Sequence, residues 1–253
     1  MDKDYEIKYH AEEEKNWWFV SRRNVILKLL KRTDKSAKIL DIGCGGGPLL
    51  LDLKAAGFTN VYGLDFSEEA VAKCVERGLS NVYVMDGHSP KFEPESFDII
   101  IASDSLEHLK NEMQALHNWH SILKSTGSLI IFVPAFMYLW SEHDIINHHY
   151  RRYTSGNLKS KVESEGFLVT KKSYWNFFMF FPTTIVRLVQ KLKGSFVKSP
   201  KTPKDQLPKT GRLLNRLLIT LLDLENIFFV STGLAVGVSA FVLAKKVERE
   251  QGI

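Results

Sequence analysis

A regular alternation of short apolar runs and helical segments fills the first half of the chain. The runs that read as strands cover residues 38–42, 60–65, 81–85, 97–102 and 127–134, and two later ones cover 167–174 and 236–245. Strands that alternate with helices require right-handed crossovers, which produce a parallel sheet covered on both faces. We therefore expect an α/β fold with a doubly wound, seven-stranded, mostly parallel sheet.

A glycine-rich loop, Asp41-Ile-Gly-Cys-Gly-Gly-Gly47, follows the first of these runs. Glycines let the backbone turn tightly and approach a ligand, and the helix that follows offers free amides to an anionic group. Pro48 suits the first turn of that helix, where its missing N–H costs nothing. Asp65 ends the second run, where a carboxylate is placed to accept hydrogen bonds from ribose hydroxyls. The pattern predicts a cofactor that contains a nucleoside.

The spacing of the glycines separates two kinds of nucleoside cofactor. A dinucleotide fingerprint needs Gly-x-Gly-x-x-Gly/Ala, and Pro48 occupies the last position when the count begins at Gly43. The pattern present is Asp-x-Gly-x-Gly-x-Gly, and with it the chain resembles the class I methyltransferases that depend on S-adenosylmethionine. The resemblance covers most of the first 135 residues, including Asp86-Gly87, the segment 95–109 and the turn at 123–129. It implies a Rossmann-like fold, S-adenosyl-L-methionine as cofactor and S-adenosyl-L-homocysteine as product.

The resemblance also implies roles for individual residues. The glycines of the loop would face the methionine end of the cofactor, Asp65 would hold the ribose, and Asp86 the adenine amine. Ser103, at the end of the fourth run, would line the sulfonium side. The whole cofactor set implied in this way is Asp41, Gly43, Gly45, Gly47, Asp65, Phe66, Asp86, Gly87 and Ser103.

Candidates for the acceptor side cluster just beyond the fifth run, in the segment 141–153. Methyl transfer requires an aligned nucleophile, exclusion of water and, for a hydroxyl or amine, removal of a proton. We predict His143 as the general base, with Asp144 fixing its tautomer and His149 as the second choice. Arg151 and Arg152 have the geometry to grip a carboxylate or phosphate, although pairing with Glu142 or with helix-end carbonyls is an open alternative.

A second resemblance extends over nearly the whole chain. Trp-Ser-x-His-Asp and His-x-Arg-Arg-Tyr within 140–153, with Trp17-Trp18-Phe19 and Arg22-Arg23, are similar to a methyltransferase subgroup of cell-surface glycan and natural-product pathways. We predict that the acceptor contacts Trp18, Arg22, Tyr150, Arg151, Arg152 and Tyr153. No metal is expected, since the spacing of His143, Asp144 and His148 matches no ligand template.

These patterns predict O-methylation of a small-molecule, glycan or natural-product acceptor. Methylation of a carboxylate at a peptide C-terminus is a variant that needs the arginines and little base. Two other classes stay open: an NAD(P)-dependent reductase, against which Pro48 argues, and a non-catalytic module at a membrane surface.

One methyltransferase domain is expected to span residues 1–253. Its predicted parts are a helical N-terminal lid (1–35), a cofactor-binding core (36–135), an acceptor-side loop, helix and strand (136–176), a basic and apolar helical insertion (177–232), and a last strand with a tail (233–253). The aromatic residues at 17–19 would close over the site, and those at 174–181 would line an extended apolar acceptor.

The net charge of +5 is unevenly distributed. Residues 185–216 contain nine Lys and Arg and one Asp, a net charge of +8, so the rest of the chain is mildly acidic. We expect this segment to be a solvated loop or to contact an anionic lipid surface, and nucleic acid is an unlikely partner because no binding motif accompanies the charge.

Several features predict a soluble protein of the cytoplasm, with a peripheral position at the inner membrane surface as an open alternative. The first fifteen residues are too charged for a signal peptide, and two cysteines make a disulfide framework implausible. The uncharged stretch 227–244 contains glycines and hydroxyl residues, so we predict a turn followed by a buried strand. The oligomeric state is left open.

Overall fold

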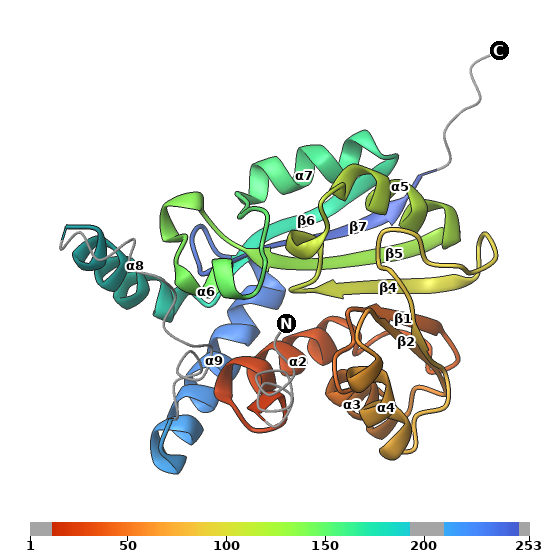
Figure 1. Ribbon diagram of the computed structural model, residues 1–253, viewed down its shortest axis with the longest axis horizontal. Coiled ribbons are helices and arrows are strands. Elements are labelled where there is room, and N and C mark those ends of the chain that lie inside the picture. Colours follow the sequence, from red (N-terminus) through yellow and green to blue (C-terminus); the bar gives the residue numbers. More distant parts are fainter. Residues whose placement is uncertain (1–11, 193–209, 248–253) are drawn as a thin grey trace.

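A seven-stranded sheet runs through the molecule in the order β3-β2-β1-β4-β5-β7-β6 (Figure 1). The computed structural model describes residues 12–192 and 210–247. The strands are β1 (Lys38–Ile42), β2 (Asn60–Asp65), β3 (Val82–Val84), β4 (Phe97–Ser103), β5 (Leu123–Pro134), β6 (Phe167–Trp175) and β7 (Ser239–Lys246). The first five strands pair in parallel, whereas β7 is antiparallel to both β5 and β6. The mostly parallel, doubly wound sheet that the sequence predicts is confirmed.

Helices cover both faces of this sheet (Figure 1). They are α2 (Trp17–Leu29), α3 (Pro48–Ala55), α4 (Glu68–Glu76), α5 (Glu112–Ile122), α6 (Glu142–Ile146), α7 (Ser155–Ser164), α8 (Phe177–Leu192) and α9 (Arg212–Ser231), with short 3-10 turns η1 (Leu106–His108) and η2 (Met137–Leu139). α5 and α7 pack on one face, and α2, α3, α4 and α9 on the other. Two apolar cores result, one on each side of the strands.

Local signals in the sequence set where the helices begin. Ser67 caps α4, since its hydroxyl accepts a hydrogen bond from the N–H of Ala70 at 3.1 Å. Asn16 caps α2 in the same way through the N–H of Trp18 at 3.0 Å, and Pro48 begins α3. Within the predicted N-terminal lid at 1–35, the described helix α2 therefore begins at Trp17 and ends at Leu29.

The uncharged stretch 227–244 is divided between two elements. Its first residues complete α9, which ends at Ser231, and its last residues belong to β7. The predicted strand thus begins at Ser239, after a turn that contains Gly237, where an added Cβ would lie 2.4 Å from the carbonyl oxygen of Trp175. Among the described helices, none has the length and apolar character needed to cross a membrane.

The parallel strands bring their carboxyl ends to one edge of the sheet, where open α/β folds bind ligands. The glycine loop follows β1, Asp65 ends β2, η1 follows β4, and α6 follows β5. Figure 1 shows α6 and the start of α8 at the end toward which β4 points. The fold therefore gathers the residues that the sequence singles out at this edge.

Candidate active site

The glycine loop has a backbone that other residues would strain. Gly43 (φ 78°), Gly45 (φ 52°) and Gly47 (φ 82°) adopt the left-handed conformation that glycine tolerates best. An added Cβ at Gly43 would lie 2.8 Å from Cβ of Ser105, and one at Gly47 would lie 2.6 Å from Leu79. Residues other than glycine would therefore be strained and crowded in this loop, which is a property of turns that approach a ligand closely.

Three carboxylates surround this loop. Asp65 accepts a hydrogen bond from the N–H of Gly45 at 2.9 Å, and Glu13 accepts one from Gly46 at 3.4 Å. Asp41 is 4% exposed, and burial, with the charges of Asp65 and Glu13, raises its pKa to about 8. A ligand that carries positive charge and hydroxyl groups would relieve this repulsion. S-adenosylmethionine has a sulfonium, an ammonium and a ribose, so the residues present fit it.

The segment before α2 lies directly on the glycine loop. Arg77, directly after α4, donates to the carbonyl of Gly46 at 2.5 Å and pairs with Glu14. Arg23 of α2 donates to the carbonyl of Glu13 at 2.5 Å and to Asp52 at 2.6 Å. The N-terminal part of the chain therefore contacts the predicted cofactor site, while residues 1–11 of the predicted lid lie outside the described residues.

The remaining predicted cofactor residues lie along the same edge. Asp86 is exposed and accepts hydrogen bonds from the N–H and the ring of His88, both at 2.8 Å, which lower its pKa. Gly87 is fixed by its carbonyl, to which the indole of Trp119 donates at 2.8 Å. Phe66 is 83% exposed, and Ser103 is half-buried at the end of β4. These positions border the edge and leave side chains open to a ligand.

The turn after β4 connects the glycine loop to the acceptor segment. Ser105 packs against Gly43, and two residues later the carbonyl of Glu107 accepts a hydrogen bond from the N–H of Tyr150 at 2.9 Å. The predicted cofactor site and the segment 141–153 are therefore neighbours through one short turn.

Within that segment, Asp144 is the centre of the polar contacts. It is fully buried, and its Oδ1 lies 2.9 Å from Nδ1 of His149. Arg152 donates Nε to Oδ1 at 2.7 Å and Nη2 to Oδ2 at 3.0 Å. Asp144 also completes a capping box with Ser141 at the start of α6. The carboxylate thus orients His149, the second choice of the sequence analysis.

His143, the first choice as general base, contacts the side chain of Asn147. Burial and the neighbouring His149 lower the pKa of His143 to about 4, so its ring is neutral at neutral pH. The rings of His143 and His149 meet edge to face, with centroids 5.9 Å apart. The structure therefore brings both histidines together, and it is His149 that hydrogen-bonds Asp144.

Arg151 and Arg152, the two arginines predicted to bind the acceptor, have partners within the protein. Besides Asp144, Arg152 contacts the carbonyl of Ala135 at 3.1 Å. Arg151 pairs with Glu112 at 3.1 Å and donates to the carbonyl of Lys110 at 2.7 Å. These contacts are of the kind that the alternative interpretation described, with Asp144 and Glu112 as the acids.

The two predicted tyrosines differ in exposure. Tyr153 is 1% exposed, and its hydroxyl donates a hydrogen bond to Glu112. Burial is the main cause that raises the pKa of this phenol, and the hydrogen bond to Glu112 is the next. Tyr150 is 52% exposed. Of the pair, Tyr150 is the one whose side chain is open to a ligand.

Arg22 is a buried cation with unused hydrogen-bonding groups. Its guanidinium lies 4.2 Å from the ring centroids of both Phe132 and Trp175, and 5.4 Å from that of Trp18. Nη2 donates to Ser239 at 2.6 Å, whereas Nε and Nη1 have no hydrogen-bond partner in the described part of the chain. Buried polar groups without partners are rare and need a ligand or water to satisfy them.

Other buried groups at this edge share that property. Neither carboxylate oxygen of Glu107 accepts a hydrogen bond from another described residue, and both polar atoms of the Asn176 side chain are without a partner. Both residues are fully buried. Burial, with the charge of Asp104, holds the pKa of Glu107 well above its usual range. The edge thus contains more polar groups than the described protein atoms satisfy.

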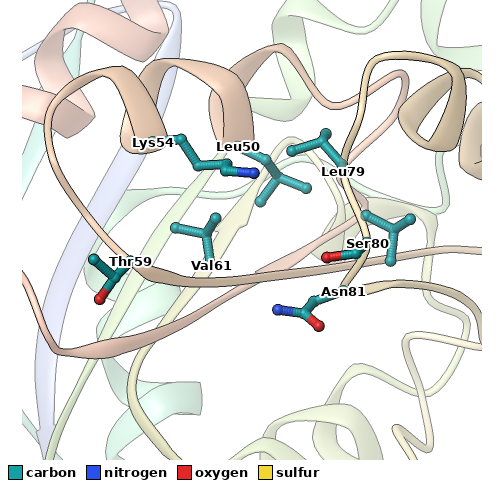
Figure 2. Close-up of a pocket in the computed structure, with 8 residues that line it drawn as sticks. Leu50, Lys54, Thr59, Val61, Leu79, Ser80 and Asn81 are labelled. Carbon is teal, nitrogen blue, oxygen red and sulfur yellow. The ribbon is translucent and has the colours of Figure 1, made fainter.

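A separate hollow lies elsewhere on the molecule. Figure 2 shows Leu50 and Lys54 of α3 beside Val61 of β2 and the residues that precede β3, Ser80 and Asn81. These residues gather near the amino ends of β2 and β3, opposite the edge that holds the glycine loop. The hollow is therefore distinct from the candidate active site.

Several known proteins are similar to this chain in sequence. Residues 40–131 match the family model described as "Methyltransferase domain". The chain is similar to the aklanonic acid methyltransferase DauC of Streptomyces sp. (strain C5), 36% identical over 39% of this chain and 49% of the relative. It is also similar to the ubiquinone biosynthesis O-methyltransferase of Photorhabdus laumondii, 32% identical over 36% of this chain and 40% of the relative. The chain thus spans less than half the length of these curated relatives.

Solved structures share the fold over most of the chain. One belongs to a complex of the Haloferax volcanii Trm112 methyltransferase activator with a methyltransferase, with a TM-score of 0.64, 14% identity, and coverage of 98% of this chain and 97% of that one. Another is phosphoethanolamine N-methyltransferase 2 of Haemonchus contortus, with a TM-score of 0.58, 18% identity, and coverage of 90% and 53%. The chain therefore has the fold of the class I S-adenosylmethionine-dependent methyltransferases, and its residues 40–131 match a methyltransferase domain.

Several residues of the site were missed by the sequence analysis. Glu107 and His108 lie inside the segment 95–109 that carried the resemblance, directly after the fourth strand, and that position was the available signal. Glu13 precedes the Trp-Trp-Phe element as one acid among several. Asn176 lies in a stretch interpreted only as aromatic, and no sequence pattern distinguishes it.

Proposed function

We propose that the chain transfers a methyl group from S-adenosylmethionine to an oxygen atom of a small-molecule acceptor. The observation that carries the proposal is the short path from the glycine loop through Ser105 and Glu107 to the histidine-rich segment at 141–153. A methyl donor beside Gly43 would face the buried polar groups that lack partners. The name of the ubiquinone biosynthesis O-methyltransferase supports oxygen as the methylated atom, and the name of DauC supports a small-molecule acceptor.

The cofactor supplies a methyl group on a sulfonium, which is already activated for displacement. The chain has to bind the cofactor and the acceptor, align the acceptor oxygen with the methyl group, and exclude water. We assign Asp65 to the ribose, Asp86 to the adenine amine, and Asp41 with the loop glycines to the methionine end. Glu13 adds a third carboxylate for the cationic part of the cofactor.

On the acceptor side, His143 presents a neutral ring to take the proton of a hydroxyl. Arg22, whose Nε and Nη1 have no hydrogen-bond partner among the described residues, is suited to bind an acceptor carboxylate or another oxygen. Trp18 and Trp175 meet edge to face beside it and exclude water from that side. Arg151 and Arg152 then hold the segment 141–153 in place by pairing with Glu112 and Asp144.

The decisive test is product analysis by mass spectrometry. The protein is incubated with methyl-labelled S-adenosylmethionine and a metabolite extract of its source cells. We expect one labelled product class that exceeds its precursor by one methylene group. Alkaline hydrolysis then separates the two chemistries, because a methyl ester from a carboxylate is cleaved and a methyl ether is not. Absence of any labelled product, with S-adenosylhomocysteine binding intact, would sink the proposal.

We also propose a peripheral contact with an anionic lipid surface. Residues 185–216 carry a net charge of +8, and α8, which contains the first part of this segment, has no fully buried residue. The part at 193–209 lies outside the described residues. Basic side chains and exposed apolar ones next to each other suit an acidic membrane surface.

A further inference from the structure

The turn after β4 and the end of the acceptor segment bring three potential metal ligands together. One ligand atom from each of Glu107, His108 and His149 lies within 4.8 Å of the others. Glu107 is fully buried, and the two histidines are half-buried. This set differs from His143, Asp144 and His148, whose spacing in the sequence matches no ligand template.

The strongest sign of a ligand is the carboxylate of Glu107. Neither of its oxygens accepts a hydrogen bond from another described residue, although the side chain is fully buried. An ionised carboxylate in such a place is costly unless a cation or donor neutralises it. Arg22 and Arg152 lie near enough to stabilise the charge, yet neither donates a hydrogen bond to it. A cation bound between Glu107 and the histidines would supply that partner.

The histidines are oriented as metal ligands usually are. A ligating imidazole coordinates through one nitrogen and donates the other N–H to a carboxylate or a backbone carbonyl. Nδ1 of His149 lies 2.9 Å from Oδ1 of Asp144, and the ring of His108 hydrogen-bonds the backbone of Asn147. The two rings meet edge to face with centroids 4.6 Å apart. Each ring therefore keeps one nitrogen for an ion.

An imidazole binds a metal ion in its neutral form, through the ring nitrogen that carries no proton. The donor set of two imidazoles and one carboxylate suits zinc and other divalent ions of the first transition row better than magnesium, which prefers oxygen ligands.

We propose that Glu107, His108 and His149 bind one divalent transition-metal ion, with Asp144 positioning His149. Three protein ligands leave coordination positions open. Because Ser105 of the same turn packs on Gly43, the ion lies beside the methyl donor's site. If the proposed function holds, an acceptor oxygen occupies an open position, and the ion lowers the pKa of that hydroxyl as a Lewis acid.

The test measures metal binding without turnover. The untagged full chain is stripped with a chelator and titrated with Co²⁺, followed by visible absorbance, and with Zn²⁺, followed by calorimetry. We expect one ion per chain. Glu107→Gln, His108→Asn and His149→Asn should each weaken binding at least about 10-fold, and Asp144→Asn about 10- to 100-fold.

Two histidine variants serve as controls. His117→Asn removes an exposed surface histidine, and His143→Asn removes a neighbour of His149 outside the ligand set, so both should leave the affinity unchanged. S-adenosylhomocysteine binding by each variant verifies that the fold is intact. If the wild-type chain binds no ion, or the ligand variants bind as well as wild type, the metal site is refuted. Methyl transfer by a metal-free chain would refute only the Lewis-acid role, whereas metal binding without any methyl transfer would refute only the proposed function.

Discussion

At the residue scale, Asp41 couples the stability of the fold to pH. Its pKa is about 8 in the folded chain because of burial and of the charges on Asp65 and Glu13, and it is near 3.8 when unfolded. Between these values the folded chain retains a proton that the unfolded chain has lost. This group therefore lowers the free energy of unfolding by about 1.4 kcal/mol for each unit of rising pH.

We predict that Asp41→Asn removes this slope. Urea denaturation of the ligand-free protein, from about pH 5 to about pH 8, should show stability declining more steeply in the wild type than in the variant. Glu76→Gln changes an exposed carboxyl of α4 and should retain the wild-type slope. Parallel curves for wild type and Asp41→Asn would contradict the assignment.

A second prediction concerns Asp65 and the ribose. Hydrogen bonds to a charged carboxylate contribute about 1.5–3 kcal/mol, so Asp65→Asn should weaken S-adenosylhomocysteine binding about 10- to 100-fold in calorimetry. Asp86→Asn keeps an amide oxygen for the adenine amine and should weaken binding less. Equal losses for both variants would place the ribose elsewhere.

At the element scale, α8 is attached to the molecule by a capping contact from another helix. Glu225 of α9 accepts hydrogen bonds from the N–H groups of Asn176 at 2.7 Å, Phe177 at 3.0 Å and Phe178 at 3.2 Å. Free N–H groups at a helix start are stabilised by such an acceptor. Because no side chain of α8 is fully buried, this cap acts beside the ring contact of Phe180 with Phe136 in holding the helix.

We predict that Glu225→Ala loosens α8 and leaves the sheet intact. The lost cap is expected to cost about 1–2 kcal/mol. Hydrogen exchange should accelerate for the amides of 177–192 and stay unchanged in β4 and β5. Asp223→Ala, which removes a partner of Asn24 and Lys28 from the same helix, serves as the matched control and should spare α8. Equal exchange in both variants would rule out the capping role.

The elements differed in how well the sequence predicted them. Strands β1, β2, β4 and β5 contain buried apolar residues and are followed by turn signals, so local pattern alone located them. The start of β7 was placed three residues early, because the turn depends on Gly237 passing close to Trp175, a contact distant in sequence.

The site shows the same division. The glycine loop and Asp65 follow a spacing rule that a sequence displays. The pairing of Asp144 with His149 instead of His143 depends on how the chain turns after α6, at His148 with a φ of 56°. Glu107 gains its importance only from burial without a partner, which no sequence pattern reports.

At the scale of the whole molecule, the exposed apolar side chains are concentrated on two helices, α8 and α9. α8 extends away from the sheet in Figure 1 and, like α9, exposes several large apolar residues. Those on α8 are Phe178, Phe181, Ile185, Val186, Leu188, Val189 and Leu192. An exposed apolar surface of this kind marks an interaction site. Its position beside the basic segment favours an acidic lipid surface over a protein of like charge.

We predict that the wild-type chain floats with vesicles that contain phosphatidylglycerol and not with neutral vesicles. Salt should weaken the binding, since exposed charges are screened. Ile185→Glu with Leu188→Glu removes two side chains worth about 1.5–3 kcal/mol each when buried, so the double variant should bind about 100-fold more weakly. Val75→Glu with Leu168→Glu makes the same change at exposed positions on α4 and β6 and should bind like wild type. Flotation that is equal for both double variants would show that α8 does not face the lipid.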